Sequence, residues 1–160
     1  MDEMDEFFLQ RAIELAREAE CRGEVPIGAV IVSAAGEIVS EASNETIERH
    51  DPTAHAEILA IRAAGQKIGN YRLTGSTVYS TIEPCAMCAG ALVNARVARL
   101  VYGAPDERFG AVRSKFEICD SGILNHRIEI VTGVLEEECR KLMQDFFRSR
   151  RIKTENGVST

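Results

Sequence analysis

Hydrophobic and polar residues follow two patterns along this chain, one typical of helices and one typical of buried strands. Near the start, Phe8, Ile13 and Leu15 recur at roughly helical spacing, and the pattern stops at Gly23. A continuous hydrophobic run over residues 25–33 and a short turn after it indicate a hairpin. The complete pattern predicts helices over residues 5–23, 54–65, 85–95 and 135–151, and strands over residues 25–33, 36–43, 76–83, 97–104 and 126–134.

Three local signals refine the helices. The run Asp51-Pro52-Thr53 is typical of a helix start, with Asp51 as a plausible cap and Pro52 in the first turn. We expect this helix to end at Gly65, and we expect Pro84 to open the next one. Residues 106–124 combine helical and loop features, so they are expected to be part helix and part loop.

The order of these elements predicts an α/β protein built as a three-layer α/β/α sandwich. Strands alternate with helices after the first hairpin, which favours a mixed five-stranded sheet with helices on both faces. A chain of 160 residues is long enough for one sizeable core, and no linker or low-complexity tract divides it. We therefore expect a single domain over residues 1–160.

The termini and cysteines indicate a cytoplasmic protein. No hydrophobic run approaches the ~20 residues of a membrane span, and the start of the chain is acidic where a secretory signal would be basic. Cysteines in the cytoplasm are normally reduced, and an odd count of five also argues against a disulfide framework.

Charge is distributed unevenly. The formal net charge of −6 argues against a general nucleic-acid coat. The chain nevertheless has an acidic tip and a basic end, which leaves two interpretations open: both are solvated surfaces, or the basic end contacts phosphate. The acidic tip comprises Asp2, Glu3, Asp5 and Glu6, and the basic helix end and tail contain Arg148, Arg150, Arg151 and Lys153.

The stretch TIEPCAMCAG places Cys85 and Cys88 three positions apart after a strand, where a helix is expected to open. A C-x-x-C pair in this context fits a redox pair, half of a structural zinc site, or part of a catalytic metal site. A helix N-terminus favours thiolates through its dipole and free N–H groups. The remaining cysteines are isolated and are expected to be buried or idle thiols.

His55 offers a third ligand at the start of the preceding helix. If the two helix starts meet, one nitrogen and two sulfurs converge, which leaves the fourth position of a tetrahedral zinc open, as in catalytic sites. Zinc bound in this way lowers the pKa of water towards ~7. Glu57 follows His55 by two residues, so its carboxylate can exchange protons with that water without binding the metal.

These motifs resemble a known family. H-A-E at 55–57 and P-C-A-M-C at 84–88 match the pattern of zinc nucleobase deaminases. The longer segments DPTAHAEI, EPCAMCAGA and DFFRSRR are similar to those of bacterial tRNA-specific adenosine deaminases, and the similarity runs from about residue 5 to residue 151. The resemblance implies the cytidine-deaminase-like fold, a homodimer and the conversion of adenosine to inosine at the wobble position of a tRNA anticodon.

The resemblance also implies roles for individual residues. It makes His55, Cys85 and Cys88 the ligands of one Zn2+ per subunit, and Glu57 the proton shuttle. The implied partner is a tRNA anticodon stem-loop, not DNA or a membrane. Further implied contacts are Asn44 with the flipped adenine, Asp106 near its sugar, and Phe146, Phe147, Arg148 and Arg151 along the stem-loop. At least one of the two phenylalanines is also expected to pack in the core.

Alternatives remain at this point. A deaminase of a free nucleobase, nucleoside or nucleotide would have the same zinc ligands, and DPTAHAEI with the basic end favours tRNA over it. A non-catalytic RNA-binding subunit should lack Glu57, and a structural zinc module or redox protein would leave 55–57 unexplained. The chain departs from many relatives at Val112–Phe116 and at 120–122, and Phe109 is also unusual.

Overall fold

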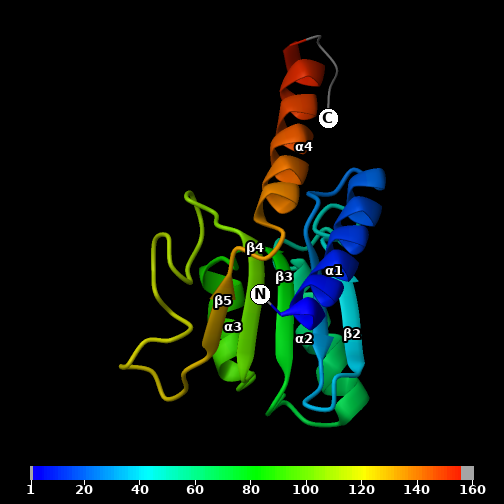
Figure 1. Ribbon diagram of the computed structural model, residues 1–160. Helices are drawn as coiled ribbons and strands as arrows, with labels where there is room; N and C mark the ends of the chain where they lie inside the picture. Colours follow the sequence, from blue (N-terminus) through cyan, green and yellow to red (C-terminus); the bar gives the residue numbers. More distant parts are fainter. Residues whose placement is uncertain (1, 156–160) are drawn as a thin grey trace.

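The computed structural model describes residues 2–155, so the last part of the expected C-terminal tail, residues 156–160, lies outside the described residues. One five-stranded sheet in the order β2-β1-β3-β4-β5 forms the centre of the molecule (Figure 1). β1 is antiparallel to both neighbours, whereas β3, β4 and β5 are parallel, which makes the sheet mixed. The strands are β1 (Gly28–Val32), β2 (Ile38–Ser43), β3 (Thr77–Ile82), β4 (Arg99–Ala104) and β5 (Glu129–Thr132).

Helices cover both faces of this sheet, which confirms the predicted three-layer α/β/α architecture. α2 and α3 lie side by side on one face, and α1 and the start of α4 pack on the other (Figure 1). The helices are α1 (Glu3–Cys21), α2 (Ala56–Ile68), α3 (Ala86–Asn94) and α4 (Glu136–Glu155). Among residues 2–155, no helix combines the length and hydrophobicity that a membrane crossing requires.

β1 shows why its run of hydrophobic residues predicted a buried strand. All five of its residues are buried. Ala29 and Ile31 pack on the side of α2 and α3, whereas Val30 and Val32 pack with Phe8 of α1. Successive side chains of a strand point to opposite faces, so a strand covered on both faces needs hydrophobic residues at every position.

α2 differs from the prediction at both ends. Asp51 does not cap the helix, because its Oδ1 atom accepts hydrogen bonds from the backbone N and the Oγ1 of Thr53 and so closes a separate turn. The helix begins instead at Ala56, with His55 as the N-cap residue. It continues past Gly65 to Ile68, where Gly69 adopts the left-handed conformation that commonly ends helices.

Residues 106–124 contain turns and no regular helix. The expectation of a partly helical segment was wrong, because a side chain rather than a helix satisfies several of its backbone N–H groups. The carboxylate of Glu83 accepts from the backbone nitrogens of Asp106, Val112, Arg113 and Ser114 at 2.9–3.0 Å. Buried backbone donors need such partners, and here one glutamate supplies them.

One end of the sheet gathers the segments that carry the candidate functional residues. The parallel strands β3, β4 and β5 all finish at this end, and the antiparallel β1 begins there. Cys85 follows β3, and α4 follows β5, so the metal-ligand motif and the basic helix leave the sheet at the same end. α4 extends away from this end beyond the body of the protein (Figure 1).

Candidate metal centre

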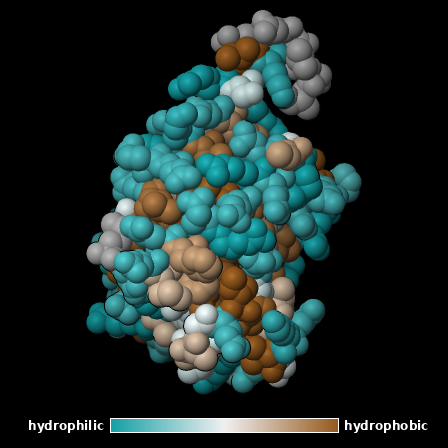
Figure 2. All heavy atoms as spheres, turned by 45° about the vertical axis from the view of Figure 1, so that its right-hand side comes forward, coloured by the Kyte–Doolittle hydropathy of each residue, from teal (hydrophilic) through white to brown (hydrophobic). Residues whose placement is uncertain are grey.

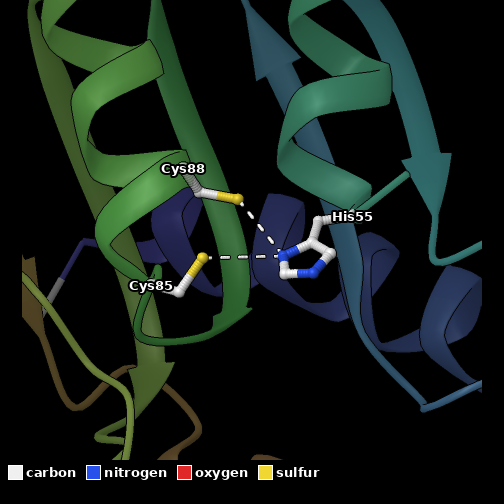
Figure 3. A group of neighbouring side chains, drawn as sticks. All are labelled: His55, Cys85 and Cys88. Atoms are coloured by element: carbon white, nitrogen blue, oxygen red, sulfur yellow. Dashed lines mark hydrogen bonds between the residues drawn. The ribbon is translucent and has the colours of Figure 1, made fainter. Parts of the chain in front are cut away.

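His55, Cys85 and Cys88 meet at the starts of two neighbouring helices. His55 is the N-cap residue of α2 and Cys85 is the N-cap residue of α3, while Cys88 lies in the first turn of α3. Figure 3 shows the imidazole Nδ1 atom and both sulfur atoms pointing toward one another from α2 and α3. The sequence prediction that two distant helix starts converge therefore agrees with the geometry.

The distances within this group suit a tetrahedral zinc ion. His55 Nδ1 lies 3.6 Å from the sulfur of Cys85 and 3.5 Å from the sulfur of Cys88. A tetrahedral zinc with ordinary Zn–N and Zn–S bonds sets nitrogen and sulfur about 3.6 Å apart. Among residues 2–155, no fourth histidine, cysteine, aspartate or glutamate joins the group. Three ligands with this geometry leave one coordination position for water or substrate.

Contacts within the triad favour a thiolate at Cys85. A hydrogen bond from Cys88, followed by one from His55, lowers the pKa of Cys85 to about 4. The same bond and burial raise the pKa of Cys88, because its proton is the one that the pair shares. Positions at the N-terminus of α3 also favour a thiolate through the helix dipole. A divalent cation would replace the shared proton and hold both sulfurs as thiolates.

Glu57 is a buried carboxylate beside this group. It lies in the first turn of α2 and is 3% exposed. Its Oε1 atom has no hydrogen-bond partner among the described residues. Burial raises the pKa of Glu57. An unsatisfied buried carboxylate oxygen is costly for folding, and a group that uses it, such as water or substrate, would remove that cost.

Asn44 is fixed next to the same helix start. Its side chain is buried, and its Oδ1 atom accepts a hydrogen bond of 2.8 Å from the backbone nitrogen of Ala56, the residue between His55 and Glu57. This contact orients the Asn44 amide beside the metal ligands.

Comparisons with known proteins agree with this centre. The zinc-binding region of cytidine and deoxycytidylate deaminases matches residues 2–104 of the chain. The chain therefore belongs to this deaminase family. The zinc cofactor and the deaminase activity inferred from the sequence motifs are thus those of the family, and the triad of His55, Cys85 and Cys88 is where the chain can bind the metal.

Several relatives of this deaminase are similar over nearly their whole length. A tRNA-specific adenosine deaminase of Haemophilus influenzae is 49% identical over 149 residues, which are 93% of this chain and 86% of that protein. A structure from studies of A-to-I editing by tRNA:A34 deaminases is 42% identical, has a TM-score of 0.82, and covers 85% of this chain and 98% of its own. A guanine deaminase of Bacillus subtilis is 34% identical, with a TM-score of 0.63 and 94% of each chain covered.

Asp106 lies in the loop that follows β4 and is tied to the metal-ligand segment. Its backbone nitrogen donates to Glu83, and its own Oδ1 atom accepts from the backbone nitrogens of Arg108 and Phe109 at 3.0 and 3.1 Å. One carboxylate oxygen of Asp106 therefore closes a turn of its own loop, a local role that the sequence did not indicate.

The basic end is not brought to the metal ligands, because it lies on the projecting α4 (Figure 1). Phe146 is buried, which confirms that one phenylalanine packs in the core, and Phe147 is 44% exposed. The Nη1 atom of Arg148 lies 3.5 Å from the Oδ1 atom of Asp145, and the side chain of Arg151 is exposed. The face of the deaminase in Figure 2 is mostly hydrophilic along this helix, with hydrophobic side chains gathered lower on the body.

Sequence reasoning missed Glu83 and Glu24. Both are buried carboxylates that hold loops at the site end of the sheet. Glu83 fastens the loop after β4, and Glu24 accepts from Thr46 Oγ1 and from the backbone nitrogens of Ile47 and Glu48, in the loop after Asn44. The available signal was an acidic residue adjoining a hydrophobic strand, such as Glu83 between residues 76–82 and Pro84.

Proposed function

We propose that this chain hydrolytically deaminates adenosine to inosine at the wobble position of a tRNA anticodon. The observation that carries the proposal is the three-ligand cluster with an unsatisfied, buried Glu57 beside it. Similarity supports tRNA as the substrate, because the relatives named for tRNA are 49% and 42% identical and the guanine deaminase is 34% identical.

His55, Cys85 and Cys88 hold one zinc ion per subunit in this proposal. Zinc, when bound, would make a water molecule acidic enough to lose a proton at neutral pH, so that the water oxygen can attack a purine carbon. Glu57 takes a proton from that water and delivers it to N1 of the adenine. It then takes the proton of the new C6 hydroxyl group and passes it to the departing amino nitrogen, so that adenosine and water become inosine and ammonia. Because burial raises the pKa of Glu57, its carboxyl group can hold the proton during each of these two transfers.

The other site residues position the substrate. The amide of Asn44, fixed by its bond to Ala56, orients the adenine over the ligands. The free oxygen of Asp106 faces the nucleotide's sugar. The anticodon stem-loop is contacted from α4 by Phe147, Arg148 and Arg151. The net charge of −6 does not prevent this contact, because cations clustered on one helix can bind the phosphates of one RNA hairpin.

The assembly follows the family resemblance. We expect one domain per chain, a homodimer in the cytoplasm, and no binding to membranes or DNA. Sedimentation of the purified protein with a labelled anticodon hairpin, a matching DNA hairpin and lipid vesicles tests these expectations together, and the proposal requires a dimer that binds only the RNA.

A direct assay tests the reaction. The purified zinc-loaded protein is incubated separately with a tRNA hairpin that carries adenosine at the wobble position, free adenosine, cytidine and guanine. Inosine formed in the hairpin supports the proposal. Deamination of a free base or nucleoside with no reaction on the hairpin would overturn it in favour of a free-base deaminase.

The same assay tests the basic helix. We expect Arg148→Ala combined with Arg151→Ala to raise KM for the hairpin about tenfold, because two cations near phosphate are lost. Arg140→Ala, whose guanidinium pairs with Glu136 and Glu137 on the same helix, is the matched control. An unchanged KM in the double variant would remove α4 from the RNA contact.

A further inference from the structure

Phe109 is a large hydrophobic side chain that the fold leaves on the surface beside the metal centre. It is 65% exposed, in a loop that is fastened to the buried carboxylate of Glu83. We infer that Phe109 is a stacking surface for a nucleobase next to the target adenosine. This inference rests on the proposed function and assigns one contact within its substrate site.

The backbone places Phe109 close to the metal ligands. The next residue, Gly110, forms an isolated β-bridge with Cys85, and the backbone nitrogen of Ala111 donates to the carbonyl of Pro84 at 2.9 Å. The loop thus runs alongside the start of α3. A nucleotide whose base occupies the zinc site has its neighbours one phosphate away, so a side chain at this position can meet an adjacent base.

The loop holds Phe109 in a defined place. The backbone nitrogens of Arg108 and Phe109 both donate to Asp106. Glu83 anchors the loop before and after this turn, and Gly110 passes so close to the Glu83 carboxyl group that a Cβ atom there would overlap it. An exposed aromatic ring on a fastened backbone loses little freedom when a ligand packs on it.

The chemistry around the ring suits a single-stranded nucleotide. The guanidinium carbon of Arg108 lies 5.5 Å from the centroid of the Phe109 ring, so a cation sits over the ring. Proteins that read splayed-out RNA loops stack the bases on aromatic side chains and use arginine for the backbone and for cation–π contacts. Phe109 and Arg108 together provide both groups beside the site.

The chain contains a matched pair of residues far from the site. Tyr71 is 75% exposed, and the guanidinium carbon of Arg72 lies 5.6 Å from its ring centroid. These residues follow the end of α2 and precede β3, whereas His55 starts α2 and Cys85 and Cys88 follow β3, so the pair lies at the opposite end of the sheet. Both pairs place a guanidinium over an exposed ring, although Arg72 Nε also donates a hydrogen bond of 3.2 Å to the Tyr71 hydroxyl, and the two pairs differ in location.

The experiment compares Phe109→Ala, Phe109→Trp and Tyr71→Ala on the adenosine-34 anticodon hairpin. We expect Phe109→Ala to raise KM about 5- to 150-fold, the usual range for loss of one base–aromatic stack. Phe109→Trp should restore KM to within about threefold of the original protein, because tryptophan also stacks. Tyr71→Ala should change neither KM nor kcat, and melting curves should show that all the variants fold.

A second readout detects the stack itself. Hairpins with 2-aminopurine on either side of adenosine-34 are bound to the Glu57→Gln variant, and we expect quenching at one position that disappears when Phe109→Ala is added. A Phe109→Ala enzyme with unchanged KM, or quenching that persists, would overturn the inference while leaving the proposed function intact. A protein that does not deaminate the hairpin at all would overturn both.

Discussion

Glu57 and Asp5 are both buried carboxylates, yet their surroundings are opposite. Asp5, 2% exposed near the start of α1, accepts hydrogen bonds from Tyr79 Oη at 2.9 Å and from two nitrogens of Arg99 at 2.7 and 2.6 Å. Glu57 has an oxygen without a partner among the described residues. The bonds to Arg99 lower the pKa of Asp5, whereas burial raises the pKa of Glu57.

This difference between the two carboxylates corresponds to a difference between the two ends of the sheet. Arg99 begins β4 at the end opposite the metal centre, where Asp5 is fully satisfied and joins α1 to the sheet. At the site end, Glu57 keeps an oxygen without a hydrogen-bond partner among the described residues. A buried polar group that only stabilises the fold has its hydrogen-bond partners within the protein. A group that reacts with a substrate must keep an atom without such a partner.

The largest effect is expected from removing a metal ligand, which tests the metal-centre end of the sheet. Cys88→Ala should reduce bound zinc from one ion per chain to nearly none and abolish deamination, because two ligands hold the ion poorly. Elemental analysis and the hairpin assay measure both losses. Cys21→Ala, which removes an exposed thiol outside the cluster, is the control and should leave zinc and activity unchanged. Full zinc content in Cys88→Ala would contradict the proposed ligands.

Glu57→Gln should separate chemistry from stability. Without a carboxylate to move protons, kcat should fall about a thousandfold. Zinc content should be retained, and the free energy of unfolding should not fall, because the change removes a carboxylate that burial disfavours. Single-turnover assays and calorimetry provide the measurements. A variant with near-normal kcat, or one that is clearly less stable, would show that Glu57 is a structural group like Asp5.

The sequence predicted the meeting of the three metal ligands better than it predicted the polar network around them. His55, Glu57, Cys85 and Cys88 occur in two short motifs at helix starts, where spacing alone determines which side chains share a side. The hydrogen-bond partners of Asp5 are set instead by the tertiary structure, because Arg99 lies 94 positions after Asp5 in the sequence. Neither residue type nor local pattern indicates that pairing.

The fold shows the same limit. The buried strands agreed with the sequence because a two-sided hydrophobic environment requires their composition. The start of α2 was misplaced because Asp51 closes a turn with Thr53 instead of capping the helix. The segment 106–124 was misjudged because the side chain of Glu83, which directly follows β3, satisfies several of its backbone N–H groups. In both cases a side-chain hydrogen bond competed with secondary structure, and propensity does not decide such competition.

Asp5→Asn tests the structural side of the comparison. The negative charge and one of the two hydrogen bonds to Arg99 would be lost, so the free energy of unfolding should decrease by about 3 kcal/mol. The Nε atom of Arg99 would still lie 3.7 Å from the Oε2 atom of Glu129, and this ion pair limits the decrease in stability. Urea titration gives the stability, and kcat and KM on the hairpin should stay within about twofold of the original values because the site lies at the other end of the sheet. A loss of activity greater than the loss of folded protein would mean that the two ends are coupled.

The smallest expected effect is the pH dependence of that stability difference, and its sign follows from the pKa. Asp5 has a lowered pKa in the folded state, against an ordinary value of 3.8, so its contribution is complete above the ordinary value and is lost as the pH falls through the folded one. The stability gap between the original protein and Asp5→Asn should therefore be constant from about pH 7 to pH 5 and shrink below about pH 4. Tyr79→Phe, which removes only a hydroxyl that donates to Asp5, is the matched control and should cost less at neutral pH. A gap that widened in acid would mean that the carboxyl group binds its partners in the protonated form, and Asp5 would then resemble Glu57 rather than differ from it.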